Sequence, residues 1–343
     1  MLDTITILLA IGLALSFLLS ISMGANDAAT PTDCAVGAGV VSIRRAIILF
    51  AIFTFIGAVT QGFMVMKTIG KGVVSEIDIL GAVAISIATS IWVLYCSYKG
   101  LDISVTHTTI GSVIGYGLAA YGLSGVNYDV LWNVVISWIT SPLSAIALSY
   151  ILYKLTAKIL AGKPWTYRLE QATSAILIIS LCFSAYSFGA NDVGNATGAY
   201  VTVAMKVGRM PDYHTMLLLS MMGAIGIAIG GFVWGKNVIE TVAFKITRID
   251  VIMGAIAELS NALVVYLFTT IPYMIFGYGM PISTSIASNA SIIGVGLAKD
   301  YRAVNYRTVT KLVAGWISTI PVATILSATV YTVLKMIFGV PTI

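Results

Sequence analysis

Charged side chains are scarce in this 343-residue chain: Lys, Arg, Asp and Glu make up 10% of it, against 58% hydrophobic residues. Soluble globular domains carry about a quarter of their residues as charges, so the scarcity excludes that class. The mean hydropathy of +0.96 points the same way. The sequence therefore predicts an all-α polytopic protein of the cell membrane. At ~20 residues per crossing, its length allows roughly ten membrane spans and no sizeable soluble domain.

The sequence also lacks the motifs of disulfide-rich proteins, zinc proteins and hydrolases. Its three cysteines, Cys34, Cys96 and Cys182, have no C-x-x-C spacing, so neither a disulfide framework nor a zinc site is predicted. Because H-E-x-x-H and G-x-S-x-G motifs are absent, the protein is expected not to be an enzyme and to need no cofactor. An intramembrane enzyme and a channel remain as remote alternatives. The net charge of +5 does not indicate nucleic-acid binding, because the basic residues lie at the ends of apolar runs.

Two polar motifs occur twice, in the same order. A Gly-Ala-Asn-Asp signature is followed by a short Ser/Thr motif and then by a Gly-x-Gly-Leu string. The signature lies at 24–27 and 189–192, the Ser/Thr motif at 103–106 and 282–285, and the Gly-x-Gly-Leu string at 115–118 and 294–297. The repeats predict a first half over residues 1–160, a cytoplasmic connector over 161–171 and a second half over 172–343. Each half is expected to contain a broken helix, at 24–31 and 189–198, and a re-entrant hairpin, at about 103–121 and 281–298.

Basic residues predict that the two halves have opposite orientations in the membrane. The connector and the loop after the second Ser/Thr motif are rich in Lys and Arg, so both are expected in the cytoplasm. Residues 121–130, which form the matching loop of the first half, contain neither. Equivalent loops then face opposite sides, as in the inverted repeats of secondary transporters, and both termini lie outside.

Asp27 and Asp192 end apolar runs, and an ionisable residue at membrane depth is a functional candidate. Gly and Pro residues around them predict interrupted helices that line a cavity, where carboxylate and carbonyl oxygens suit a sodium ion. The Ser/Thr motifs precede short apolar segments, so their hydroxyls and a helix N-terminus could hold an oxyanion. Ordinary helix capping is the alternative for both motifs. Glu258, inside another apolar run, is expected to face the same cavity, and His107 could donate to the anion.

These motifs resemble those of the inorganic phosphate transporter (PiT) family, which carries duplicated Gly-Ala-Asn-Asp-Val-Ala-Asn-Ala and Pro-Val-Ser-Thr-Thr-His signatures. Residues 189–198 match the first signature closely, and residues 24–31 match it in their first half. The resemblance implies an inverted-repeat symporter with two hairpins meeting at the midplane, driven by sodium or by protons. It also implies a possible homodimer. We expect phosphate to be carried together with sodium ions by alternating access, with a proton-coupled phosphate permease or a sulfate permease as the alternative.

The resemblance, combined with the polar motifs, implies two sets of ligands. The expected phosphate ligands are Asn26, Asn191, Ser104, Thr106, His107, Ser283, Thr284 and Ser285. The expected sodium ligands are Asn26, Asp27, Asn191, Asp192, Asn195 and Glu258. Several positions depart from the family pattern. Thr54 stands where a first-half glutamate is expected, Thr30 replaces an Asn, Asp102 a Pro and Ile286 a His.

Overall fold

The computed structural model describes residues 4–99, 103–201, 213–242 and 249–339, and within these ranges the chain is helical with one isolated β-bridge. Among the described residues, eight helices are long and apolar enough to cross a membrane. They are α1 (Thr4–Asp27), α3 (Ile43–Gln61), α5 (Ile79–Tyr98), α7 (Tyr128–Leu160), α8 (Tyr167–Thr197), α10 (Tyr213–Val242), α11 (Val251–Phe276) and α13 (Tyr306–Phe338). The prediction of an all-α polytopic membrane protein is confirmed, and the protein is a multi-pass membrane protein.

The remaining helices are short. Two of them, α6 (Val105–Tyr121) and α12 (Thr284–Lys299), coincide with the predicted hairpins. Further short elements with described bounds are α2 (Asp33–Gly37), α4 (Phe63–Lys67), a π-helix (Thr68–Gly72) and two 3₁₀ turns, Gly122–Gly125 and Tyr301–Ala303. Both α6 and α12 are buried along nearly their whole length, whereas α7 and α13 expose most of theirs. The hairpin helices therefore form the centre of the molecule, and the long helices shield them.

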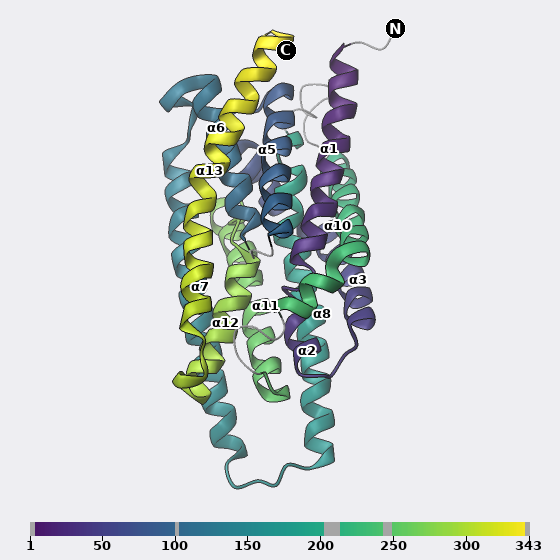
Figure 1. Ribbon diagram of the computed structural model, residues 1–343, viewed down its shortest axis with the longest axis vertical. Coiled ribbons are helices and arrows are strands. Elements are labelled where there is room, and N and C mark those ends of the chain that lie inside the picture. The colour runs from purple at the N-terminus through teal and green to yellow at the C-terminus, as the bar shows by residue number, and fades with distance from the viewer. Residues whose placement is uncertain (1–3, 100–102, 202–212, 243–248, 340–343) are drawn as a thin grey trace.

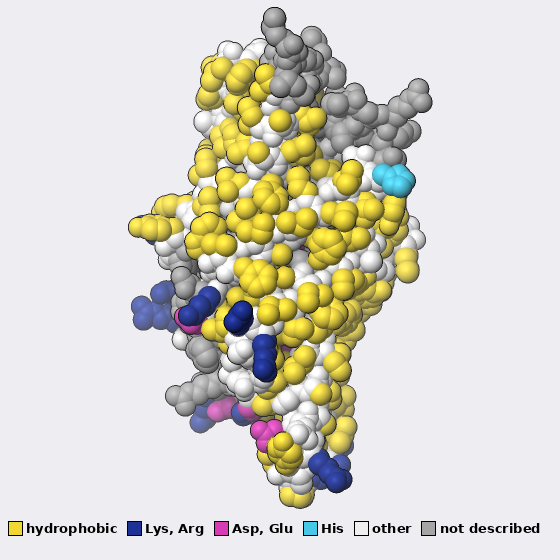
Figure 2. All heavy atoms as spheres, turned by 90° about the vertical axis from the view of Figure 1, so that its right-hand side faces the viewer, with side chains coloured by type: hydrophobic (Ala, Val, Ile, Leu, Met, Phe, Trp, Pro, Cys, Tyr) yellow, Lys and Arg dark blue, Asp and Glu magenta, His cyan; other side chains and the backbone are white. Residues whose placement is uncertain are grey.

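The two hairpin helices run towards opposite ends of the molecule (Figure 1). The turn after α6 lies at the end where α1 begins and α13 ends, whereas α12 leads to the end that holds the α7–α8 connector. Lys and Arg side chains gather in the half of the molecule that holds this connector, and an apolar surface covers much of the rest of the visible face (Figure 2). At the charged end, Lys299 donates to Asp250 at 2.6 Å, and this hydrogen bond raises the pKa of the Lys299 ammonium above its ordinary value.

Several helices of each half pack mainly on helices of the other half. Helix α6 packs on α13, and α12 packs on α7; likewise α1 packs on α10, and α8 packs on α3. Within each half, α5 lies against α1 and α6, just as α11 lies against α8 and α12. This pattern makes α3 the counterpart of α10 and α5 the counterpart of α11. The repeat boundaries at residues 160 and 172 stay a prediction.

Glycine permits the closest of these crossings. A Cβ atom added at Gly24 would lie 1.9 Å from the carbonyl oxygen of Ile227, and one at Gly189 would lie 2.0 Å from that of Thr54. The first residue of each signature is therefore a packing glycine, on which a neighbouring backbone lies directly. Small residues let membrane helices approach in this way. The approach places the rest of each signature at the centre of the bundle.

Candidate functional site

The first signature breaks its helix, as predicted. Helix α1 ends at Asp27, a turn follows, and α2 begins at Asp33. Pro31 lies in this turn, and because proline has no backbone N–H it cannot continue the hydrogen-bond pattern of the helix. The main-chain N–H of Thr30 instead donates to the carbonyl of Asp27 at 3.0 Å. The break leaves Asp27 at the end of a helix, and this residue is only 1% exposed.

In the second signature the helix continues past the aspartate and ends at the far end of the predicted interruption, residues 189–198. Helix α8 continues through Asp192 and ends at Thr197, where Gly198 follows. The reason is that this copy has no proline, and Gly194 keeps a helical backbone whose carbonyl accepts from the N–H of Gly198 at 2.8 Å. Asp192 is therefore presented from the side of a continuous helix rather than from its end.

Serine residues cap the two hairpin helices in the same way. Ser104 accepts from the main-chain N–H of His107 at 3.1 Å, and Ser283 accepts from that of Ile286 at 3.3 Å. For these two hydroxyls the capping role that the sequence left open is the one observed. The first N–H groups of a helix have no partner within the helix, and its N-terminus carries a partial positive charge. Both caps thus start helices whose positive ends point into the protein.

Asp192 lies between the two hairpins. Its Oδ1 accepts from Asn195 at 2.9 Å and from the Thr106 hydroxyl of α6 at 3.5 Å. The Asn195 amide also donates to Thr106 at 3.0 Å. The Thr284 side chain, from the first turn of α12, lies on the same carboxylate. One carboxylate is therefore in contact with the N-terminal turns of both hairpin helices.

Asp27 has a matching arrangement with the other hairpin. The Ser285 hydroxyl donates to Asp27 Oδ1 at 3.4 Å, and the Thr30 hydroxyl donates to Ser285 at 3.5 Å. Ser285 occupies in α12 the position that Thr106 occupies in α6, and Thr30 follows Asp27 at the distance at which Asn195 follows Asp192. Thr30, a departure from the family pattern, thus keeps the hydrogen bond of its counterpart. Each signature aspartate contacts the hairpin of the other half.

The two hairpin tips also contact each other directly. The Thr106 hydroxyl, in the first turn of α6, donates at 3.0 Å to the carbonyl of Ile282, two residues before α12 begins. Two helix N-termini therefore converge beside the signature aspartates, at the centre of the bundle. Because both helix ends are positive, an oxyanion placed between them would be stabilised without any Arg or Lys.

Buried oxygens without a donor line the face of α8 at the second signature. Among the described residues, Oδ1 of Asn191, Oδ2 of Asp192 and Oδ1 of Asn195 have no hydrogen-bond partner. The Asn191 amide is held by Thr269 at 2.7 Å and by the carbonyl of Met280 at 2.9 Å, which fixes the direction of its oxygen. Buried polar oxygens without a donor are rare, and amide and carboxylate oxygens are ligands of hard cations. This donor set fits a sodium ion.

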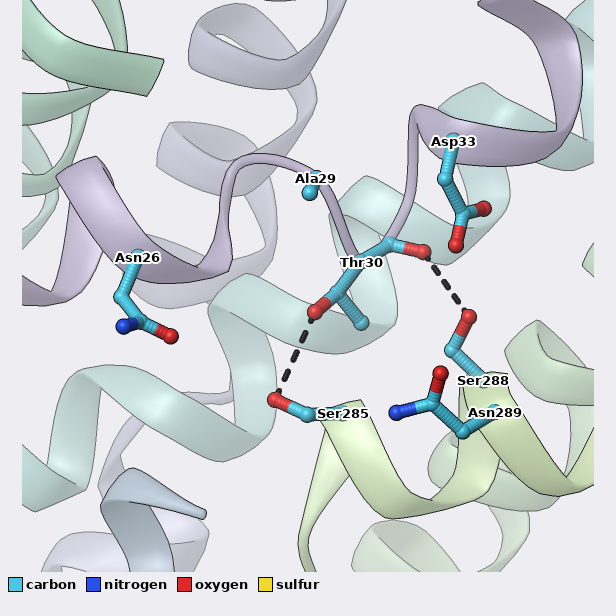
Figure 3. Close-up of a pocket in the computed structure, with 7 residues that line it drawn as sticks. All are labelled: Asn26, Ala29, Thr30, Asp33, Ser285, Ser288 and Asn289. Atoms are coloured by element: carbon cyan, nitrogen blue, oxygen red, sulfur yellow. Dashed lines mark hydrogen bonds between the residues drawn. The ribbon is translucent and has the colours of Figure 1, made fainter. Parts of the chain in front are cut away.

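A small cavity lies between the broken α1 and the start of α12 (Figure 3). It has a volume of about 10 Å³, which is room for one water-sized species and too little for a phosphate ion. In it the Ser288 hydroxyl donates to the carbonyl of Thr30 at 3.2 Å. The lining residues are Asn26, Ala29, Thr30, Asp33, Ser285, Ser288 and Asn289. The space between these two elements therefore has room for an ion or a water molecule.

The expected equivalence of Thr54 and Glu258 was wrong. Helix α5, rather than α3, is the counterpart of α11, and the shared Gly-Ala-x-Ala string places Ile85 opposite Glu258. Thr54 instead donates to the carbonyl of Ala185 at 3.2 Å, at the crossing of α3 and α8. Glu258 lies beside Asp33 and Cys34 of α2 and has no observed contact with the signature aspartates. Thr54 therefore does not mark a missing carboxylate.

His107 does not join the other expected phosphate ligands. Its ring packs on Trp138 with 4.0 Å between ring centroids and lines an apolar cavity between α7 and α13. Ile286, which replaces the expected second histidine, lines the same cavity. Both side chains line this apolar cavity, so the replacement of histidine by Ile286 removes no ligand from the site at the signature aspartates. Asp102, the remaining departure, lies outside the described residues.

Sequence reasoning missed several residues at this site. Asp33, Ser288 and Asn289 all line the cavity, yet none was selected from the sequence. The signal for the last two was present: with Ser285 they stand at i, i+3 and i+4 of a helix and so share one polar face. Asp33 follows the first signature by a single turn. Its role depends on the break in α1, which folds α2 back towards α11.

The fold and the site define a class before any comparison is made. Eight membrane-crossing helices enclose two buried short helices whose positive ends meet at paired carboxylates, as in secondary transporters with broken helices. A sequence profile described as the phosphate transporter family matches residues 23–327. The chain belongs to the phosphate transporter family, and its function is phosphate transport rather than catalysis.

Known proteins that match over nearly their whole length agree. A protein of Pyrococcus furiosus described as a phosphate permease is 29% identical, over 97% of this chain and 97% of its own. A Bacillus subtilis protein described as a low-affinity inorganic phosphate transporter is 30% identical, over 92% of this chain and 93% of its own. A solved structure described as the sodium-dependent phosphate transporter matches with a TM-score of 0.87 and 28% identity, covering 96% of this chain and all of that one.

Proposed function

We propose that the protein carries inorganic phosphate into the cell together with sodium ions, by alternating access. The observation that carries this proposal is the convergence of the N-termini of α6 and α12 beside both signature aspartates. A positive helix end suits the anion, while the adjacent carboxylates and amide oxygens suit cations. The similarity to a sodium-dependent phosphate transporter supports the choice of coupling ion.

Phosphate is proposed to lie between the two hairpin tips. Its ligands would be the first main-chain N–H groups of α6 and α12 and the hydroxyls next to them, from Thr106, Thr284 and Ser285. The capping serines, Ser104 and Ser283, would hold the helix ends in place rather than reach the anion, since each accepts a main-chain hydrogen bond. Because the Thr106 hydroxyl and the Ile282 carbonyl are in contact at 3.0 Å, the hairpin tips would have to separate before phosphate enters.

Sodium is proposed to bind at the two signatures, one ion at each. At the second signature the ligands would be the oxygens of Asn191, Asp192 and Asn195 that accept no other hydrogen bond. At the first signature they would be Asn26 and Asp27. Charge requires such ions, because a phosphate dianion beside two carboxylates in a low-dielectric region would be strongly repelled. A homodimer remains a prediction from the family resemblance.

Uptake of labelled phosphate into proteoliposomes tests the proposal. An inward sodium gradient should drive uptake, replacement of sodium by potassium should abolish it, and excess sulfate should not compete. Uptake that ignores sodium but follows a pH gradient would assign proton coupling to the same fold. Competition by sulfate would mean that the anion site does not distinguish the two tetrahedral oxyanions.

A further inference from the structure

Three side chains with metal-binding atoms meet between α2 and α11. They are Asp33, Cys34 and Glu258, whose ligand atoms all lie within 4.8 Å of one another. Each of the three residues is 1% exposed. Two of them come from the start of α2 and one from the middle of α11, so the cluster joins two separate elements.

Glu258 is the member that needs a partner. Neither of its carboxylate oxygens has a hydrogen-bond partner among the described residues. The side chains of Ser184, Asn261 and Cys34 lie beside it, and the Asn261 amide donates to the Ser184 hydroxyl at 3.0 Å. A buried carboxylate without hydrogen bonds is costly unless a proton or a cation accompanies it. On the side of α2, the groups beside Glu258 are the Cys34 thiol and the Asp33 carboxylate, and a cation would offset the repulsion between the two carboxylates.

The cluster also adjoins the ion-sized cavity. The Asp33 side chain comes from α2 and projects towards the Ser288 and Asn289 side chains of α12 (Figure 3). The cavity volume of about 10 Å³ is enough for one water molecule or one small ligand next to an ion. A cation held by Asp33 would thus have an open coordination position on the cavity side.

We propose that Asp33, Cys34 and Glu258 bind one thiophilic divalent cation of the zinc class. A cation of charge +2 offsets more of the negative charge of two carboxylates and a thiolate than a monovalent ion does. A thiol is a ligand for zinc-like ions and not for sodium, calcium or magnesium. On binding, the Cys34 thiol forms its bond to the metal through sulfur and releases its proton to solution. Three protein ligands leave a fourth position for water from the cavity.

Occupancy of this site would link α2 to α11. Helix α2 begins directly after the break in α1, so the metal would hold the polypeptide just beyond Asp27. Movement of the first signature relative to α11 would then be restricted while the metal is bound. The inference rests on side chains outside the proposed sodium and phosphate ligands, and it holds whichever anion the protein carries.

Metal binding to the purified full-length protein tests the proposal. Detergent-solubilised protein is stripped with a chelator and titrated with Zn²⁺ against a zinc indicator, and bound metal is counted by mass spectrometry. Cd²⁺ is used in parallel, because its bond to a thiolate absorbs in the ultraviolet. We expect one Zn²⁺ per chain and a Cd²⁺–thiolate band. Cys34→Ser should remove the band and weaken Zn²⁺ binding about tenfold or more.

Cys182→Ser is the matched control, because it removes a thiol outside the cluster. It should bind Zn²⁺ and Cd²⁺ as the unaltered protein does. Glu258→Gln should weaken Zn²⁺ binding while keeping the thiol, and Cys34→Ser, which preserves side-chain shape, carries the test if that variant does not fold. Equal Zn²⁺ binding by the unaltered protein and Cys34→Ser would overturn the proposal. So would loss of binding in Cys182→Ser, or no bound Zn²⁺ in the unaltered protein.

Discussion

The Ser285 hydroxyl donates to the Asp27 carboxylate at 3.4 Å, between residues that are 258 positions apart in the sequence. Thr106 and Asp192 form the corresponding pair at 3.5 Å. Each pair joins the signature of one half to the hairpin of the other. If a signature aspartate moves in one half, the hairpin hydroxyl bonded to it in the other half must move as well. Such a link is what coordinated binding of a cation and an anion requires.

The signature carboxylates are the first residues to test. Asp192→Asn keeps the size and most hydrogen bonds of the side chain but removes the negative charge that would hold a cation. We expect sodium-driven phosphate uptake to fall to background, with the protein still folded and inserted. The measurement is initial uptake rate in proteoliposomes.

Asp129→Asn is the control, because Asp129 is an exposed residue of the first turn of α7. It should transport normally. If Asp192→Asn kept both its rate and its sodium dependence, Asp192 could not be a ligand of the coupling ion.

The hydroxyls opposite the aspartates should have smaller effects. Ser285→Ala removes a hydrogen bond whose net contribution is about 0.5–1.5 kcal/mol, so the phosphate and sodium concentrations for half-maximal uptake should each rise by roughly two- to tenfold. Ser285→Thr keeps the hydroxyl and should recover most of the loss.

Thr310→Ala serves as the reference substitution. Its hydroxyl is exposed and bonds only to the carbonyl of Tyr306 in its own helix. In Thr310→Ala, the phosphate and sodium concentrations for half-maximal uptake should be unchanged. An equal rise in both alanine variants would mean that the Ser285 effect is not specific to the site.

The packing glycines of the two signatures are expected to determine stability. Gly24→Ala and Gly189→Ala would each place a methyl group about 2 Å from a backbone carbonyl, so the crossing helices must move apart. Overpacking of this kind costs about 1–3 kcal/mol. Both variants should unfold at lower temperature in detergent, as measured by tryptophan fluorescence.

Gly315→Ala provides the comparison, because a Cβ atom there meets nothing within 4 Å. It should unfold at the temperature of the unaltered protein or slightly above it, since alanine favours helix. Unfolding of Gly24→Ala at the unaltered temperature would show that α1 and α10 are not held at this contact.

The position of His107 makes a prediction that differs from the expectation based on sequence. His107→Ile introduces the residue found at the equivalent position in α12, where Ile286 lines the same apolar cavity. The phosphate concentration for half-maximal uptake should change by less than about threefold, because the ring contacts Trp138 rather than the hairpin tips. A tenfold or larger rise would instead place the imidazole on the anion.

Much of this fold follows from the sequence, because hydropathy and repeated motifs are local signals. They predict the membrane class, the two short helices and the central position of both signatures. The contact of each signature aspartate with the hairpin of the other half could not be predicted. Repetition shows that Ser285 and Thr106 are equivalent, but not that Ser285 would meet Asp27 rather than Asp192. That choice depends on how the helices pack in three dimensions.

The misassigned partner of Glu258 has a similar cause. Both α3 and α5 are apolar, and motif order alone does not show which of them corresponds to α11. The backbone contact between Gly189 and Thr54 settles it, because the matching contact joins Gly24 to Ile227 of α10. The two signatures also interrupt their helices at different distances from the aspartate, for a simpler reason. Glycine permits a break in a helix, whereas Pro31 in the first signature enforces one.

The most direct test of the account is phosphate uptake into proteoliposomes in which only the sodium gradient is varied, at fixed pH and with the membrane potential clamped. The account predicts accumulation against the phosphate gradient with sodium outside, and its reversal when sodium is inside. It also predicts loss of accumulation in both Asp27→Asn and Asp192→Asn. Phosphate that only equilibrates, at a rate independent of sodium, would contradict the account.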